Sequence, residues 1–339
     1  MKFIHTMKIF AGTLLCLSLF SQVTNSQTYS FKNYGAENNI PNSSVYTIDQ
    51  SDDGFLWVGT GSGLARFDGY NFYNIQFPDS SLLRYTTSSL KDKNGTLWFG
   101  CNDGSIYYSN KNALVQVKLS IEKSISDLAE GPDGLIYVVP QGTAIFSINP
   151  ARVDDIHKYT FSEDQVMLSA AFAGKSKMLI GTQESLLICN LDKDSVSVAG
   201  AVEGFDYSPV TVILQTGDSS EFVIGTDGSG LFKLHLSDTG NTLSEFINHP
   251  ELESIRIQSI IRDSEKNLWI STFGSGVIQL SFSDNFETIN STRLYNLNSG
   301  LVTDDIKIVF QDIEENIWIG TYYEGISMLT SYAFEYYMP

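Results

Sequence analysis

The most constraining feature of this sequence is a short phrase that returns seven times at nearly even spacing. Each copy opens with an aromatic or aliphatic lead residue, continues through β-branched residues and commonly Gly-Thr, and then crosses a polar turn into an alternating apolar run. Successive lead residues are 39 to 49 positions apart. A period of about 40 to 50 residues is typical of the blades of a β-propeller. The lead residues are Trp57, Trp98, Tyr137, Leu179, Val223, Trp269 and Trp318.

Each repeat divides into four short apolar runs separated by turn signals, which predicts four strands per repeat. In the first repeat these strands are expected at Ser44–Gln50, Phe55–Thr60, Leu64–Asp68 and Asn71–Phe77. No segment of useful length has a helical period. The predicted fold class is therefore all-β: a seven-bladed β-propeller of four-stranded antiparallel blades, occupying residues 28–331.

The lead tryptophans and the glycines that follow them are expected to be structural. A single blade buries too little apolar surface, so neighbouring blades must pack face to face, and a tryptophan on the second strand would fill the space between them. Stacking of a tryptophan on a ligand is the alternative. The residues concerned are Trp57, Trp98, Trp269 and Trp318, with Gly59, Gly100, Gly225 and Gly320.

The number of candidate outermost strands exceeds the number of blades by one. If Thr28–Tyr34 completes the last blade beside Gly325–Leu329, the ring closes by mixing its two ends, which protects both sheet edges. If Tyr332–Tyr337 completes it instead, the N-terminal strand is left over. The first arrangement is favoured, which leaves residues 332–339 as a surplus strand that could begin a missing module.

Residues 1–27 have the pattern of a secretory signal peptide. Lys2 and Lys8 precede an apolar stretch from Ile9 to Phe20, and a polar segment follows. The mature chain is therefore expected to be periplasmic or secreted, without a membrane span. Cys101 and Cys189 fall in different repeats, so we expect both to be unpaired and buried.

Charge and motif content exclude several classes of function. The formal charge of −18 makes nucleic acid and anionic lipid poor partners, and leaves cations, neutral polar ligands such as sugars, or protein. The histidines do not lie at ligand spacing, so no metal site is expected. Acidic residues recur at the turn between first and second strands, where turn formation explains them. We therefore predict no catalytic residues, no enzymatic activity and no cofactor.

Several motifs of the repeats resemble the two-component regulator propeller repeats of extracellular sensor halves in Bacteroidetes-type hybrid two-component proteins. The likeness extends from Tyr29 to the C-terminus and is strong at both ends. It is carried by the turns Asn39–Ser43 and Ser299–Asp304, the Asp/Asn-Gly-x-Leu-Trp-x-Gly phrases of Asp53–Thr60 and Asn94–Gly100, and the run Gly63–Phe72.

The resemblance implies a sensor role but also a difference in domain order. Members of that family are similar in carrying a signal peptide, two propellers, an immunoglobulin-like linker, a membrane helix and a kinase or DNA-binding output. This sequence holds one propeller, so it is expected to be either a free-standing binding propeller or the front piece of a split or truncated sensor. Its expected partners are a second propeller or a sensor kinase.

A ligand site is expected from propeller geometry. The loops between second and third strands and the connections between blades emerge on one face around the axis, and here they mix aromatic rings with amides and acids. Such a surface suits a saccharide, because rings stack on pyranose faces while amides and carboxylates bond hydroxyls. The alternative is that the aromatics cap the core or meet a second propeller. The candidate residues are Asn102, Asp103, Gln183, Glu184, Asp227, Phe273, Tyr322 and Tyr323.

The predicted function is a periplasmic, non-enzymatic ligand-sensing propeller that recognises a glycan or its breakdown product and acts through another protein or a downstream half. Two alternatives stay open. One is a polysaccharide-acting lyase or glycosidase, since the fold does not settle the function. The other is a structural propeller that only docks a neighbouring protein.

Overall fold

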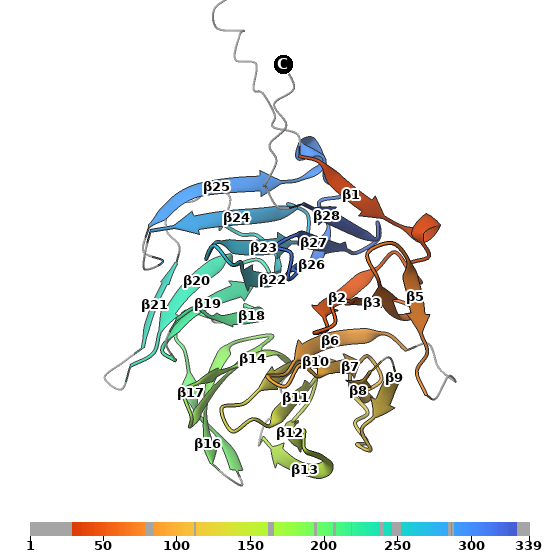
Figure 1. Ribbon diagram of the computed structural model, residues 1–339. Coiled ribbons are helices and arrows are strands. Elements are labelled where there is room, and N and C mark those ends of the chain that lie inside the picture. The colour runs from red at the N-terminus through yellow and green to blue at the C-terminus, as the bar shows by residue number, and fades with distance from the viewer. Residues whose placement is uncertain are drawn as a thin grey trace, which may run out of the picture.

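The predicted seven-bladed propeller is confirmed by the computed structural model. The structure describes residues 29–330 except 79–83, 112, 162–165, 193–194, 206–207, 218, 238–240, 246–251, 284–285 and 287. Seven separate four-stranded antiparallel sheets stand around a common axis (Figure 1). The predicted signal peptide and the surplus strand at 332–339 lie outside the described residues. Within the described part of the chain, no helix has the length and hydrophobicity needed to span a membrane.

The innermost strand of every blade lines the axis, and its first residue is fully buried against a neighbouring blade. Blades 1 to 7 are numbered here by the order of these strands, which contact one another in sequence and again from the last to the first. They are β2 (Val45–Gln50), β6 (Thr86–Lys91), β10 (Ile125–Glu130), β14 (Met167–Ala173), β18 (Val210–Gln215), β22 (Ile257–Arg262) and β26 (Ile306–Gln311).

The second strands carry the lead residues and form the most buried layer. Five of them have no exposed or half-buried residue, because both faces of the strand pack against neighbouring blades. They are β3 (Leu56–Thr60), β7 (Leu97–Cys101), β11 (Ile136–Pro140), β15 (Lys177–Thr182), β19 (Glu221–Thr226), β23 (Leu268–Thr272) and β27 (Ile317–Thr321).

The third and fourth strands complete each blade towards its outer rim. The third strands are β4 (Gly63–Phe67), β8 (Ile106–Asn110), β12 (Ala144–Asn149), β16 (Leu186–Asp192), β20 (Leu231–His235), β24 (Val277–Phe282) and β28 (Ile326–Leu329). The fourth are β5 (Phe72–Ile75), β9 (Ala113–Gln116), β13 (Arg152–Thr160), β17 (Ser195–Ala201), β21 (Thr242–Glu245), β25 (Ile289–Tyr295) and, for blade 7, β1 (Phe31–Tyr34).

The ring is closed by the two ends of the chain, as the favoured arrangement predicts. Strand β1 pairs antiparallel with β28, from Phe31 opposite Leu329 to Tyr34 opposite Ile326. The side chains of Ser327 and Asn33 add a hydrogen bond of 2.7 Å across this pair. The outer edge of β28, the third strand of the last blade, is therefore covered by β1 and is not free to pair with another chain.

The recurrent glycine of the second strand permits a close approach between blades. A Cβ added at Gly59 would collide with the side chain of Thr86, the first residue of the next innermost strand. At Gly320 it would lie 2.7 Å from Cγ1 of Val45 and 2.6 Å from Cγ2 of Ile308. Glycine therefore recurs because the innermost strand of the next blade occupies the space of a side chain.

The lead tryptophans are buried between blades, as predicted. Trp57, Trp98, Trp269 and Trp318 are 1 to 3 % exposed. The following threonine has a separate role, since its hydroxyl bonds a backbone carbonyl of the next hairpin, as in Thr321 to Gly325 at 2.9 Å. The Gly-Thr phrase thus combines close packing with closure of the adjacent turn.

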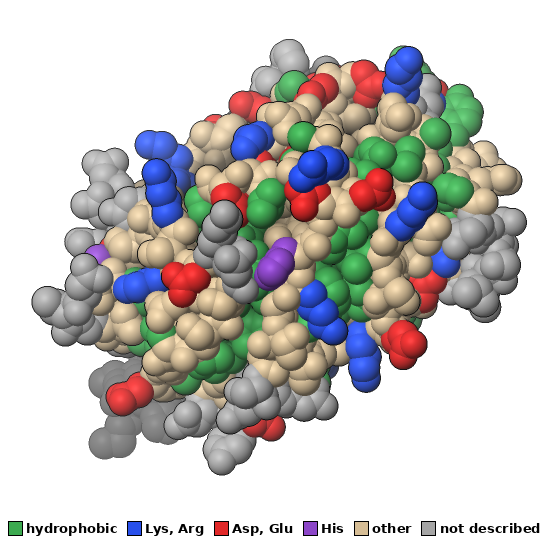
Figure 2. Space-filling model, turned by 90° about the horizontal axis from the view of Figure 1, so that it is seen from below, with side chains coloured by type: hydrophobic (Ala, Val, Ile, Leu, Met, Phe, Trp, Pro, Cys, Tyr) green, Lys and Arg blue, Asp and Glu red, His purple; other side chains and the backbone are tan. Residues whose placement is uncertain are grey.

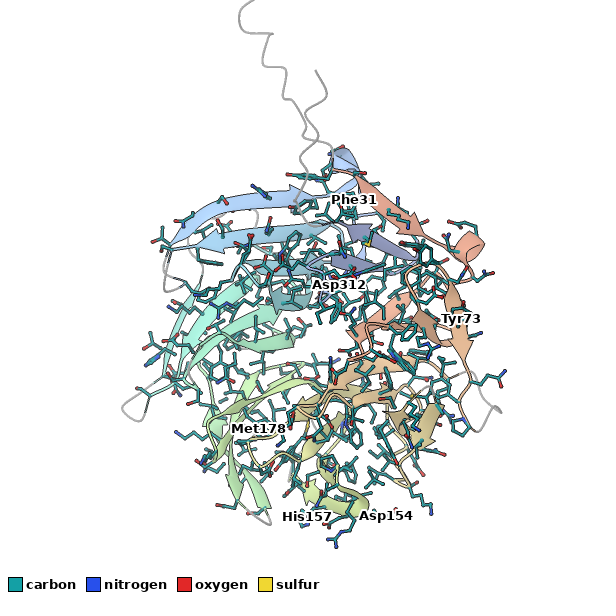
Figure 3. All side chains as sticks on the ribbon, viewed as in Figure 1. Phe31, Tyr73, Asp154, His157, Met178 and Asp312 are labelled. Atoms are coloured by element: carbon teal, nitrogen blue, oxygen red, sulfur yellow. The ribbon has the colours of Figure 1, made fainter. Side chains whose placement is uncertain are left out.

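Three of the tryptophans are held by a buried aspartate six residues earlier. The indole nitrogens of Trp98, Trp269 and Trp318 donate to Asp92, Asp263 and Asp312 over 2.9, 2.8 and 2.7 Å. Asp312, labelled in Figure 3, also accepts the amides of Glu314 and Asn316. Each aspartate therefore joins the turn between the first two strands to the packing between blades.

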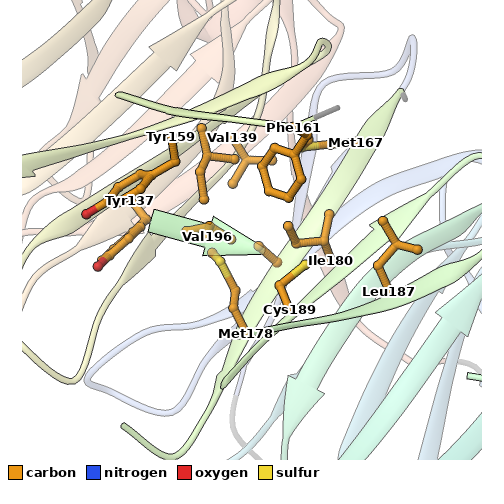
Figure 4. Close-up of a cluster of buried hydrophobic side chains, with 12 residues drawn as sticks. Tyr137, Val139, Tyr159, Phe161, Met167, Met178, Ile180, Leu187, Cys189 and Val196 are labelled. Carbon is orange, nitrogen blue, oxygen red and sulfur yellow. The ribbon is translucent and has the colours of Figure 1, made fainter. Parts of the chain in front are cut away.

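The core consists of separate apolar clusters between neighbouring blades. Figure 4 shows the cluster between blades 3 and 4, in which Tyr137 packs with Met167, Met178 and Cys189. Cys189 and Cys101 are both buried and unpaired, as predicted. Burial raises the pKa of the Cys189 thiol to about 12, so it is a packing residue with little thiolate character.

Candidate functional site at the axial mouth

A β-bulge places one extra residue of every innermost strand at the same end of the propeller axis. In all seven blades the pairing between first and second strands shifts after the first residue. The first residue is buried, whereas the second, the bulge residue, is half-buried in every blade. Bulges commonly redirect a side chain at a binding site. The seven bulge residues are Tyr46, Thr87, Ser126, Leu168, Thr211, Gln258 and Lys307.

Four of the predicted ligand residues come together beside this ring. Phe273 and Tyr322, from the loops after β23 and β27, meet edge to face with their ring centroids 5.1 Å apart. The Arg256 guanidinium lies 4.7 Å from the Phe273 centroid and donates to Asp227 from Nε over 2.7 Å. Tyr323 follows Tyr322 at 6.0 Å between ring centroids.

Two bulge residues extend this cluster towards the axis. Tyr322 donates its hydroxyl to Oε1 of Gln258 over 2.5 Å, and Nζ of Lys307 lies 3.5 Å from the same oxygen. The Lys307 ammonium is also 5.8 Å from the centroid of the Tyr322 ring. Burial raises the pKa of Tyr322 to about 12, so its hydroxyl remains a donor at neutral pH.

Blade 1 continues the aromatic surface. The ring of Tyr46 stacks on Tyr85 at 5.0 Å with an interplanar angle of 26°. Burial and the neighbouring Tyr85 and Tyr323 raise the pKa of the Tyr46 phenol, which links this pair to blade 7. We call the following nine residues the mouth cluster: Tyr46, Tyr85, Asp227, Arg256, Gln258, Phe273, Lys307, Tyr322 and Tyr323.

The other predicted ligand residues lie apart from the mouth cluster or are already engaged. Asp103 accepts from Nε of Arg84 at 2.7 Å, and Asn102 accepts the backbone amide of Tyr85 at 3.0 Å. This pair therefore anchors the connection that carries Tyr85. Gln183 and Glu184 are exposed on the loop between β15 and β16, in blade 4.

The bulge residues of blades 2, 3 and 5 use their hydroxyls to hydrogen-bond the backbone of the next blade. Thr87, Ser126 and Thr211 donate to the carbonyl of the first residue in the next innermost strand, over 2.6, 2.7 and 2.8 Å. These hydroxyls connect one blade to the next, so their hydrogen-bonding capacity serves closure of the ring.

A separate hollow of about 430 Å³ opens between blades 3 and 4 at the opposite end of the strands. Its floor is formed where Tyr137 stands opposite Ser147 across β11 and β12. His157, labelled on the outer strand in Figure 3, lines it, and Figure 2 shows a histidine beside a run of hydrophobic side chains on this side of the molecule.

The hollow has a packing origin. In the other blades the residue opposite the lead residue is larger than serine. Blade 3 combines that small partner with a tyrosine in place of tryptophan, and the space is left unfilled. Tyr137 donates its hydroxyl to Asp133 over 3.0 Å, which satisfies the phenol within the blade.

The described residues contain no group of three histidine, cysteine or carboxylate side chains that could hold a metal ion. His235 lies on β20 and contacts Oε1 of Glu221 at 2.8 Å through Nδ1. That pair is on the third and second strands of blade 5, away from the bulge residues.

Residue-by-residue interpretation of the sequence missed Tyr46, Gln258, Lys307 and Arg256. The signal that could have found the first three is their shared place, second in each innermost strand. Arg256 has no such marker, because its partner Asp227 lies 29 residues earlier in another blade.

Comparison with known proteins agrees with the fold. The two-component regulator propeller family matches residues 39–62 and 251–274. A stretch of 72 residues, 21 % of this chain, is 36 % identical to histidine kinase P4 of Formosa agariphila and covers 5 % of that protein. The chain thus spans a small part of that kinase.

Solved structures give a similar result. The extracellular domain of a hybrid two-component system of B. thetaiotaomicron has a TM-score of 0.71 and 25 % identity, over 89 % of this chain and 42 % of that one. Virginiamycin B lyase of Staphylococcus aureus has a TM-score of 0.67 over 89 % of this chain and 99 % of that one, but its 15 % identity shows the fold alone. Two segments of this propeller therefore match the two-component regulator propeller family, and the chain is similar in structure to the extracellular domain of a two-component system.

Proposed function

We propose that this propeller is the ligand-recognition module of an extracellular two-component sensor and that its mouth cluster binds a saccharide without turning it over. The observation that carries the proposal is the convergence of four predicted ligand residues with three bulge residues at one end of the axis. The similarity to sensor domains supports the sensing role. Signal output then requires a partner, which is either a second propeller or a part that carries a kinase.

The chemistry of the mouth cluster suits a sugar. Tyr323 is 65 % exposed and offers a ring face to a pyranose. The Gln258 amide and the Asp227 carboxylate provide hydrogen-bonding groups next to aromatic surface, the combination that small polar ligands require. Because these groups come from several blades, a bound ligand would bridge blades 5, 6, 7 and 1.

The proposal is tested by binding of a saccharide panel to the purified chain, followed by calorimetry on the best ligand. Tyr323→Ala should weaken that ligand at least tenfold, since stacking area is lost. Tyr70→Ala is the matched control, because Tyr70 is 87 % exposed and lies in a hairpin at the opposite end of the strands. The Tyr70→Ala variant should bind the saccharide with unchanged affinity.

Two outcomes would contradict the proposal. If no saccharide raises the melting temperature or binds, while a protein partner occupies the mouth, the site is a docking surface. If incubation shortens a polysaccharide and the loss of one mouth residue abolishes the cleavage, the propeller is an enzyme.

A further inference from the structure

The cations near the axial mouth differ in how they are neutralised. Arg84 is paired with Asp103 at 2.7 Å, and Arg256 is paired with Asp227 at 2.7 Å. Lys307 makes no ion pair with a carboxylate of the described residues. Its Nζ lies 3.5 Å from the Gln258 amide oxygen and 5.8 Å from the centroid of the Tyr322 ring.

The environment of Lys307 makes an unpaired charge costly. The side chain is half-buried at the bulge of β26 and is surrounded by protein on the side of Tyr322 and Gln258. Burial lowers the pKa of the Lys307 ammonium, and the field of Asp227 opposes this effect only in part. A desolvated ammonium is stabilised when an anion replaces its lost water.

We propose that Lys307 binds an anionic group of the ligand, so that the saccharide recognised at the mouth carries a carboxylate or a sulfate. This inference rests on the proposed function and specifies its ligand class. The anionic group would contact Nζ of Lys307, while the sugar ring lies against the exposed Tyr323 and the Gln258 amide bonds a hydroxyl.

The charge of the whole chain does not prevent such binding. At physiological ionic strength the Debye length is about 8 Å, so distant surface carboxylates are largely screened. The nearby Asp227 is already paired with Arg256. The overall charge of −18 therefore acts mainly by slowing the approach of anions.

The test uses two matched pairs of probes with the purified full chain. One pair is trigalacturonic acid and its fully methyl-esterified form, which keeps the rings and removes the charge. The other is a sulfated disaccharide and its desulfated counterpart. We expect the wild-type chain to bind the charged member of one pair at least tenfold more tightly than the neutral member, and the pair concerned distinguishes carboxylate from sulfate.

Lys307→Gln should remove that preference while leaving the affinity for the neutral member within twofold. Lys158→Gln is the control, because Lys158 also lies 5.8 Å from an aromatic ring, that of Phe146, but on the outer strand of blade 3. It should leave both affinities unchanged. Lys307→Met, of similar length, checks that a loss of binding does not reflect misfolding, since its melting temperature should match that of the wild type.

The outcomes separate this inference from the proposed function. Equal binding of charged and neutral members, with loss of both in Tyr323→Ala, overturns the anion site and leaves saccharide recognition standing. A charged-ligand preference that survives in Lys307→Gln also overturns it. If none of the four probes binds, and no other saccharide does, both fail.

Discussion

The bulge residues of blades 6, 7 and 1 and those of blades 2, 3 and 5 occupy the same position and serve different purposes. In the second group the short hydroxyl side chains of Thr87, Ser126 and Thr211 bond the next blade. In the first group, Gln258, Lys307 and Tyr46 are too long for that contact and present their functional groups at the mouth. The comparison teaches that a residue at this bulge can either hydrogen-bond the next blade or present its functional group at the mouth. The length of the side chain decides between these two roles.

The packing between blades shows a related division. Blades 2, 6 and 7 hold a lead tryptophan through a buried aspartate. Blades 4 and 5 have Leu179 and Val223 as lead residues, which have no polar group to anchor and pack in apolar clusters of aliphatic and phenylalanine side chains. The mouth cluster is thus built mainly on blades with aromatic lead residues, where the second strand is fixed at both ends.

The largest expected loss of stability comes from placing a side chain in the tight contact between blades 7 and 1. Gly320→Val should destabilise the fold by about 3 kcal/mol, because its side chain would overlap Val45 and Ile308. Urea unfolding measures this loss. Blade 3 already has Val139 at the equivalent position, so Val139→Ala should lower the free energy of unfolding by less than Gly320→Val does. Equal losses in the two variants would show that blade 7 is not more tightly packed than blade 3.

A smaller effect is expected from the aspartate that holds Trp318. Asp312→Ala removes the acceptor of the indole and of two backbone amides and should cost about 2 kcal/mol. In blade 1 the indole of Trp57 donates instead to Ser51 over 3.2 Å, so Ser51→Ala should cost less than half as much. Chemical denaturation of both variants checks the ranking, and a reversed order would contradict the role assigned to the buried carboxylate.

The smallest effect tests the division among the bulge residues directly. Thr211→Val keeps the shape of the side chain and removes the hydroxyl that bonds Ile257, so stability should fall by about 1 kcal/mol. Gln258→Met should leave stability within about 0.5 kcal/mol, but reduce ligand affinity. Thermal unfolding and calorimetry on both variants separate these effects, and a binding loss in Thr211→Val alone would break the comparison.

The repeat predicts the fold well because its residues act within a blade or against the adjacent one. Trp57 and Gly59 recur because every blade meets the same neighbour geometry, and the first innermost strand, expected at Ser44–Gln50, is found at Val45–Gln50. Asp263 and Asp312 could have been found by their distance of six residues before tryptophan. The acidic residues at these turns were explained by turn formation alone, which does not predict a hydrogen bond to the indole nitrogen.

The mouth cluster was harder to predict because it is assembled across blades. Gln258 and Tyr322 meet although 64 residues separate them, and the repeat pattern of either residue does not indicate the other as its partner. Asn102 and Asp103 have the composition of a ligand site, yet their side chains secure a neighbouring connection. Propeller geometry predicts that the candidate loops share one end of the axis, whereas the choice of which polar groups stay free of protein partners depends on pairings that only the structure reveals.

The pairing of β1 with β28 has a consequence for the order of assembly. Asn33 and Ser327 are 294 positions apart, so at a synthesis rate of about 5 to 20 residues per second β1 waits roughly 15 to 60 seconds for its partner. The six blades that are continuous in sequence can form during this interval, each on the one before. When the chain folds in the order of its synthesis, blade 7 is therefore completed last, because its outermost strand comes first in the sequence and its other three strands come last.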